Sequence, residues 1–278
     1  MKVELVFTLL AMNVAKTILI TGSTDGIGRL AAKKLVDMGH TVIVHGRSPE
    51  RIQATKAELG GDDIDSVECD LSDLDKVKCM AQTIAAKYKK IDVLINNAGV
   101  YLTQYRTTKD GLDTRFVVNA LAPYLLTKEL ISIIPKDGRV INLSSAAQEP
   151  VNLDALRGKD HLSDDFAVYA QSKLAITTWT RYWAQSLPDG GPIMIAVNPG
   201  SLLATKMVWE GFGVAGHDVN KGADILISLA LDPKHGKCIG DYFDNDRGNY
   251  GPAHRDVYDL KKAEALVQTM DEIITPSR

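Results

Sequence analysis

The chain has 278 residues, of which 45% are hydrophobic, and a formal net charge of −3. It can bury one large core, and its intermixed charges form no basic patch of the kind that binds nucleic acid or membrane surfaces. Three widely spaced cysteines and six scattered histidines match no metal-ligand spacing. We therefore expect a cytoplasmic protein without a metal, nucleic-acid or membrane partner.

Residues 1–13 precede the first clear strand pattern. Their apolar stretch "VELVFTLLAM" is about ten residues long and contains Glu4, whereas a membrane-spanning helix needs roughly 20 residues. It shows no cleavage site typical of a signal peptide. We predict a loosely packed or disordered N-terminal extension over 1–13, with Met12 as an alternative start, and a single domain over 14–278.

From residue 16 onward, apolar runs of strand length alternate with longer runs of helical period. The predicted strands are 16–22, 41–47, 65–71, 91–99, 138–145, 193–200 and 238–243. The predicted helices are 28–38, one opened by Ser48 and Pro49, one opened by the capping-box-like "SDLD" (72–75), 110–134 with a bend at Pro123, 166–186, 219–231 and 256–273. Such alternation predicts an α/β fold: one doubly wound, Rossmann-type domain with a seven-stranded parallel sheet and helices on both faces.

The first predicted strand ends in "TGSTDGIG", which places Gly22, Gly26 and Gly28 in the turn to the first helix. Glycines at this position let the backbone approach a dinucleotide pyrophosphate, which the helix N-terminus favours. The spacing is GxxxGxG rather than GxGxxG, and a glycine-rich turn without a ligand is the alternative. We predict a dinucleotide site.

The end of the second strand bears on which dinucleotide binds. NAD sites usually carry an acidic residue there, but this chain reads "VHGRS" and offers Arg47. A guanidinium suits a 2′-phosphate, and Arg29 and Ser23 are close enough in sequence to assist. The pattern favours NADP(H), although a solvated loop charge would also explain Arg47.

Tyr169 and Lys173 lie four residues apart in "YAQSK", so a helix would place both side chains on one face. A nearby ammonium and the positive charge of a nicotinamide both favour the phenolate, so we expect Lys173 and the cofactor together to lower the pKa of Tyr169 toward the working range. Taken alone, the spacing occurs by chance in many soluble proteins and favours two ordinary surface residues on an amphipathic helix.

Six motifs occur in one order: "TGSTDGIG", "NNAG" (96–99), Asn119 in "VVNALAP", "NLSS" (142–145), "YAQSK" (169–173) and "NPG" (198–200). With them the chain resembles the short-chain dehydrogenases/reductases over about residues 14–245. The 23 residues between Ser145 and Tyr169, together with "GDYFDN" (240–245), resemble the retinol-dehydrogenase-like branch.

The resemblance implies a catalytic set. Tyr169 would be the general acid/base, and Lys173 would bind the nicotinamide ribose. Ser145 would hydrogen-bond the substrate oxygen, with Ser144 as the alternative if the register slips by one. Asn119 would hold a water that relays protons to Lys173.

The resemblance also implies a cofactor set. Asp70 would lie near the adenine, and Thr205 near the carboxamide or pyrophosphate. The implied cofactor-binding residues are Gly22, Ser23, Gly26, Ile27, Gly28, Arg47, Asp70, Leu71, Asn97, Ala98, Gly99, Asn119, Tyr169, Lys173, Pro199, Gly200 and Thr205.

The expected activity is NADP(H)-dependent interconversion of an apolar or aromatic alcohol and its carbonyl, as in a carbonyl reductase. Related proteins imply a homodimer through helices 110–134 and 166–186. The insertion 146–168 could be a lid or a surface excursion. The glycine-interrupted segment 201–219 could be a mobile loop over the substrate or local core. The alternatives are a non-catalytic NADP(H) sensor or scaffold, and a nucleotide-sugar epimerase, which shares YxxxK.

Overall fold

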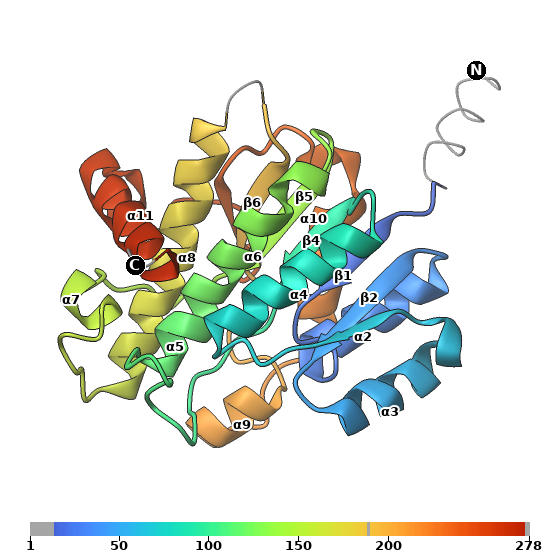
Figure 1. Cartoon of the computed structure of the whole chain (residues 1–278), viewed down its shortest axis with the longest axis horizontal. Coiled ribbons are helices and arrows are strands. Elements are labelled where there is room, and N and C mark those ends of the chain that lie inside the picture. The colour runs from blue at the N-terminus through green and yellow to red at the C-terminus, as the bar shows by residue number, and fades with distance from the viewer. Residues whose placement is uncertain (1–13, 188–189, 276–278) are drawn as a thin grey trace.

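The computed structural model describes residues 14–187 and 190–275, and the predicted extension 1–13 lies outside them. Its centre is an eight-stranded sheet of order β3-β2-β1-β4-β5-β6-β7-β8 (Figure 1). The strands are β1 (Thr17–Ile20), β2 (Thr41–Gly46), β3 (Ser66–Glu68), β4 (Val93–Asn96), β5 (Arg139–Leu143), β6 (Ile193–Asn198), β7 (Asp241–Asp244) and β8 (Asn249–Tyr250). The predicted doubly wound α/β class and the seven parallel strands are confirmed, whereas the short β8, antiparallel to β7, is an addition.

Helices cover both faces of this sheet. In the described residues the α-helices are α2 (Gly26–Asp37), α3 (Pro49–Leu59), α4 (Leu74–Lys87), α5 (Thr114–Phe116), α6 (Ala122–Leu130), α7 (Leu153–Leu156), α8 (Asp165–Ser186), α9 (Lys206–Phe212), α10 (Asn220–Leu231) and α11 (Leu260–Ile274). Alternate strand residues face opposite layers. Ile18 and Ile20 pack with α2 and α10 in one apolar cluster, and Leu19 packs with α4 and α6 in another.

Two predicted helix starts have different outcomes. Ser48 caps α3 as expected, because its Oγ accepts from the Arg51 amide at 3.3 Å and Pro49 follows it. The capping-box prediction for "SDLD" is wrong by one residue: Asp73 caps α4. Ser72 is engaged elsewhere, since its hydroxyl and its amide both donate to Asp70.

The long helix predicted over 110–134 consists of four consecutive helical segments, of which the last is the 3-10 turn η3 (Ile131–Ile133). A π-helical turn, η2 (Val117–Leu121), joins α5 to α6, and Pro123 lies in the first turn of α6, where its missing N–H costs little. The stretch Thr114–Ile133 is long and apolar enough to cross a membrane by composition, but 72% of its most apolar window is buried inside the protein. A core helix meets the same criterion.

A third apolar cluster joins α5, α6 and α8 to the C-terminal helix α11, which lies against α8 at the side of the molecule (Figure 1). Leu266 and Met270 of α11 are buried there, and the Tyr124 hydroxyl donates to Asp271 at 2.8 Å. Of these helices, α5, α6 and α8 belong to the segments through which the sequence resemblance implied a homodimer. One side of α8 is covered by α11.

Candidate active site

Tyr169 and Lys173 occupy the first half of α8 and face the carboxyl end of β5. The Lys173 side chain is buried, and its ammonium donates to the Leu143 carbonyl oxygen at 2.8 Å. The same nitrogen lies 5.6 Å from the centroid of the Tyr169 ring. Tyr169 is half-buried. The YxxxK pair is therefore directed at the end of the sheet and not at the outer surface.

The structure decides between the two serines of "NLSS". Ser145 hydrogen-bonds the Tyr169 phenol, and its own carbonyl accepts from the Tyr242 hydroxyl at 3.0 Å and from Gln148 at 2.9 Å. Ser144 is buried, and its hydroxyl donates to the Lys173 carbonyl and pairs with the Thr177 hydroxyl. Ser145 is the serine in the site, and Ser144 anchors β5 to α8.

Asn119 lies in the π-helical turn η2, a kind of turn that is frequent at functional sites. Its side-chain amide donates to the Val100 carbonyl and the Ser172 hydroxyl, each at 2.9 Å, and accepts from the Val100 amide at 2.8 Å. The side chain thus ties the segment after β4 to α8. The role of Asn119 in holding a relay water stays a prediction.

Burial dominates the electrostatics of Tyr169 and Lys173 in the unliganded protein. Burial raises the pKa of Tyr169, and the hydrogen bond from Ser145 only partly opposes this effect. Burial also lowers the pKa of Lys173 to about 8. Desolvation is the largest influence on both groups in the unliganded protein. The expected lowering of the Tyr169 pKa by Lys173 together with the nicotinamide charge stays a prediction for the complex with the dinucleotide.

The "NNAG" motif joins the ends of β1 and β4 at the topological switch point. The Asn97 side-chain amide donates to the carbonyls of Thr21 and Gly22, at 2.9 and 3.1 Å. The Thr21 hydroxyl accepts from the amides of Asn97 and Ala98. Residues 97–99 therefore sit directly beside the glycine-rich turn, as the predicted cofactor floor requires.

The three glycines of the turn serve different purposes. A Cβ on Gly28 would lie 2.4 Å from the Asn97 side chain, and one on Gly22 would lie 2.9 Å from Ala98, so both are glycine because protein atoms occupy the space. Gly26 has φ +51° and meets only Thr205, whose methyl carbon would be 3.6 Å from its Cβ. Gly26 therefore leaves the approach to the first turn of α2 open.

The first turn of α2 fits a pyrophosphate. It contains no acidic residue after the cap Asp25, and Ile27 and Gly28 place main-chain N–H groups at the helix N-terminus. Thr205, the cap of α9, lies next to Gly26, which matches the pyrophosphate of its two predicted positions. These residues would hold a nicotinamide dinucleotide, with Lys173 and Asn97–Gly99 at the end near the reacting atoms.

His45, at the end of β2, holds the glycine-rich turn from behind. Its Nδ1 accepts from the Gly22 amide at 2.9 Å, and its main chain pairs with Ser23. The Ser23 hydroxyl is thereby engaged with His45 and Ile20 rather than directed at a phosphate. Burial lowers the pKa of His45 to about 4.

This burial predicts a pH dependence of stability. The pKa of His45 is about 4 when folded and 6.5 when exposed, so the unfolded chain binds more protons between these values and stability falls as pH falls through this window. We expect a loss of about 2 kcal/mol in the free energy of unfolding between pH 7 and pH 5. Urea unfolding at both pH values should show this slope, and a His45→Asn variant should lack it. An equal loss of stability in the variant would contradict the assignment of this pH dependence to His45.

Several arginines bear on the region beyond the C-terminal end of β2, where a 2′-phosphate would bind. Arg47 is exposed and forms no ion pair or hydrogen bond with any residue that the structure describes. Arg29 pairs with Glu58 at 3.6 Å instead of assisting Arg47. Arg51 pairs with Asp25 at 2.7 Å and donates to the Thr24 carbonyl. Arg51 is a further candidate for binding the 2′-phosphate, and sequence reasoning missed it.

Two further predicted segments complete the cofactor side. Asp70 lies just beyond β3 with Oδ1 accepting from Ser72, and Leu71 is buried in the core. The "NPG" turn after β6 is held by the end of β7: Asn198 donates to Asp244 and Asp246, and Asn245 donates to the Pro199 carbonyl. Gly200, at φ +124°, makes the turn.

The segment 201–219 contains the short helix α9. Trp209 on α9 is 64% exposed, and Met207 and Val208 are half-buried. The Met207 methyl carbon would lie 3.9 Å from a Cβ on Gly99. Part of α9 therefore faces the cofactor floor and part faces solvent, which fits a segment over the substrate better than local core.

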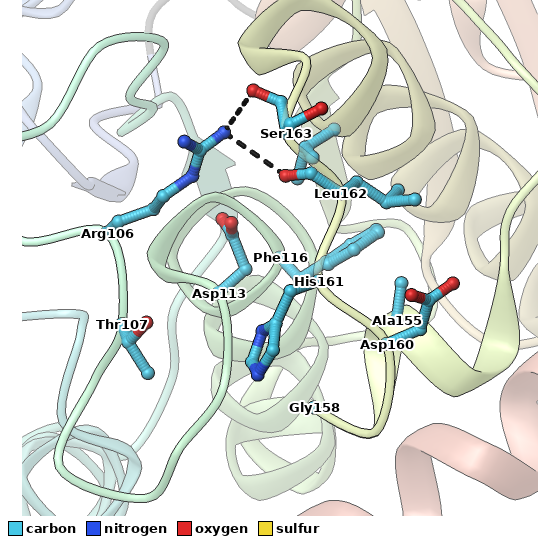
Figure 2. Close-up of a pocket in the computed structure, with 11 residues that line it drawn as sticks. Arg106, Thr107, Asp113, Phe116, Ala155, Gly158, Asp160, His161, Leu162 and Ser163 are labelled. Carbon is cyan, nitrogen blue, oxygen red and sulfur yellow. Dashed lines mark hydrogen bonds between the residues drawn. The ribbon is translucent and has the colours of Figure 1, made fainter.

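The insertion 146–168 is held to the rest of the protein by hydrogen bonds and an ion pair. Arg106 donates to the carbonyls of Leu162 and Ser163, at 3.1 and 2.8 Å (Figure 2). The buried Arg115 pairs with Asp113 and Asp165. A cavity of about 380 Å³ lies between this insertion and the loop before α5, and it is not lined by the catalytic set. The insertion is a packed excursion beside α8.

Four residues near the site were not predicted: His45, Arg51, Tyr101 and Tyr242. Tyr242 was inside the quoted "GDYFDN" motif, which marked the segment without giving its role. The Tyr101 ring meets Tyr169 edge to face, with centroids 5.3 Å apart.

Comparisons with known proteins agree with this geometry. The family model described as short chain dehydrogenase matches residues 16–213. Retinol dehydrogenase 12 of Mus musculus is 32% identical over 81% of this chain and 78% of its own length. A candidate daunorubicin C-13 ketoreductase of Streptomyces sp. (strain C5) is 32% identical over 84% of each chain. A metagenomic short-chain oxidoreductase solved in complex with NADP is 27% identical, with a TM-score of 0.59 over 79% of this chain and 93% of its own.

Proposed function

Because the chain belongs to the short-chain dehydrogenase family, in its retinol-dehydrogenase-like branch, and is an oxidoreductase, we propose that it uses NADP(H) to interconvert an apolar or aromatic alcohol and its aldehyde or ketone. The observation that carries the proposal is the convergence of Ser145, Tyr169 and Lys173 at the carboxyl end of β5, beside the Asn97–Gly99 floor. A cytoplasmic location and a homodimer stay predictions.

The bound nicotinamide supplies or accepts the hydride. In reduction, the Tyr169 hydroxyl gives its proton to the substrate oxygen as negative charge develops there, and the Ser145 hydroxyl donates a hydrogen bond to the same oxygen. Lys173, held by the Leu143 carbonyl, stabilises the resulting phenolate through its charge. In oxidation the same groups act in reverse, with the Tyr169 phenolate as the base.

The preference for NADP(H) over NAD(H) is supported by the exposed, unpaired Arg47 and by the absence of an acid at the end of β2. The NADP complex of the metagenomic neighbour agrees. We expect Arg47→Gln to raise the KM for NADPH by about 10–100-fold, because a charge-assisted bond to phosphate contributes about 1.5–3 kcal/mol. The KM for NADH should change less than about threefold. Steady-state kinetics check this, with Arg29→Gln as the matched control; equal loss with both dinucleotides would contradict the role.

The apolar substrate class is supported by the side chains around Tyr169. Tyr101 lies against the catalytic ring, and Met207 faces the floor next to Gly99. The names of the relatives, a retinol dehydrogenase and a candidate daunorubicin C-13 ketoreductase, point in the same direction.

The proposal is tested by NADPH consumption, followed by absorbance, with a panel of apolar and aromatic aldehydes, ketones and quinones, and with NADH in parallel. Turnover with NADPH preferred is the expected result. Turnover with NADH preferred would retain the chemistry and reject the role of Arg47. Protein that binds NADPH and turns over nothing would favour the non-catalytic sensor.

A further inference from the structure

Tyr101 lies between two elements that are far apart in the sequence. Its ring meets the ring of Tyr169 edge to face, at an interplanar angle of 65°. On α9, a Cβ on Gly211 would lie 2.5 and 2.6 Å from Cδ1 and Cε1 of Tyr101. The ring therefore touches both the catalytic tyrosine and the bare backbone of α9.

The other end of α9 lies beside the dinucleotide turn. Thr205 caps the helix, and its methyl carbon would be 3.6 Å from a Cβ on Gly26. Between the ends, Met207 faces Gly99 on the cofactor floor. The helix α9 thus lies between the dinucleotide turn at Gly26 and the Tyr101 ring, which meets Tyr169.

Gly211 has no other explanation in the fold. A glycine inside a helix weakens it relative to alanine, and the backbone of Gly211 is helical and needs no positive φ. The space that a side chain would fill is taken by the Tyr101 ring alone. The glycine is therefore an adaptation to the ring.

We propose that Tyr101 is a positioning residue through which α9, seated on the dinucleotide turn, holds the Tyr169 ring in place for proton transfer. The inference rests on the proposed function for its catalytic consequence. The structural half of the inference is the contact between the Tyr101 ring and α9, and this contact does not depend on any substrate.

The catalytic consequence is tested by a double-mutant cycle with the best carbonyl of the panel. Gly211→Ala is expected to lower kcat at least tenfold, with the KM for NADPH within about twofold, because the methyl group displaces the Tyr101 ring. In a Tyr101→Ala background the same change should alter kcat less than twofold. Tyr101→Phe, which keeps the ring, should retain kcat within about threefold. Equal losses from Gly211→Ala in both backgrounds, or a Phe variant as impaired as the Ala variant, would overturn the proposal.

The structural half is tested by hydrogen exchange of the amides of 206–212 in the protein without dinucleotide or substrate. Tyr101→Ala should speed this exchange at least tenfold, and Tyr101→Phe should leave it within twofold. Unchanged exchange in Tyr101→Ala would overturn the contact with α9. Faster exchange together with no turnover by the parent protein would reject the proposed function and keep the contact.

Discussion

Tyr169→Phe is expected to lower kcat for carbonyl reduction by about 10²–10⁴-fold, because the variant has no proton to give to the substrate oxygen. The phenyl ring still packs against Tyr101 at the 5.3 Å spacing, and the hydroxyl is not part of the dinucleotide turn. NADPH affinity should therefore stay within about threefold. Single-turnover kinetics and NADPH fluorescence titration measure the two effects separately.

The matched control for this change is Tyr105→Phe, since Tyr105 is 72% exposed and lies outside the catalytic set. It should keep kcat within about twofold. If Tyr169→Phe also kept its activity, the acid/base assignment would be wrong. If cellular function survived while turnover was lost, the non-catalytic sensor would be the better account.

Lys173→Met is expected to abolish turnover and to stabilise the unliganded fold. The pKa of Lys173 is about 8 when folded and 10.5 when exposed, so holding its charge in the buried site costs about 3 kcal/mol at pH 7. The variant removes this cost but leaves the Leu143 carbonyl without its donor, a loss of about 1 kcal/mol. The free energy of unfolding should rise by about 2 kcal/mol at pH 7.

The direction in which stability changes with pH follows from the difference in proton binding between the folded and the unfolded chain. Between pH 8 and pH 10.5 the unfolded chain binds more protons at Lys173 than the folded chain, so the stability of the parent protein gains with rising pH in that window. The advantage of Lys173→Met should therefore shrink from pH 7 to pH 10. Urea unfolding at both pH values measures it, with the exposed Lys78→Met as control. A variant less stable than the parent at pH 7 would contradict the burial cost.

The fold could be predicted because its signals are local. Alternating apolar runs marked seven strands, and Ser48 before Pro49 marked the start of α3. The misses arose where a nearby competitor changed the outcome. Asp70 took the Ser72 hydroxyl and moved the cap of α4 to Asp73. The two-residue β8 has too short a pattern to detect.

The residues of the site could be predicted from the sequence, but the contacts between them could not. The order of the six motifs identified Ser145, Tyr169 and Lys173, whereas their spacing alone did not. Tyr242, which supports the Ser145 carbonyl across β5–β7, lies 97 residues away in the chain. Tyr101 meets α9 only through the folded arrangement, and the effect of burial on the pKa of Lys173 depends on the packed surroundings of α8.

The most direct test of the oxidoreductase account uses NADPH that carries deuterium at both C4 positions. The enzyme is incubated with the best carbonyl of the panel, and mass spectrometry measures the deuterium content of the alcohol product. One deuterium per product molecule is expected on the former carbonyl carbon, and the Tyr169→Phe variant should form at least about 100-fold less of this alcohol over the same time. Alcohol formed without deuterium would contradict hydride transfer from the dinucleotide, and with it the proposed function.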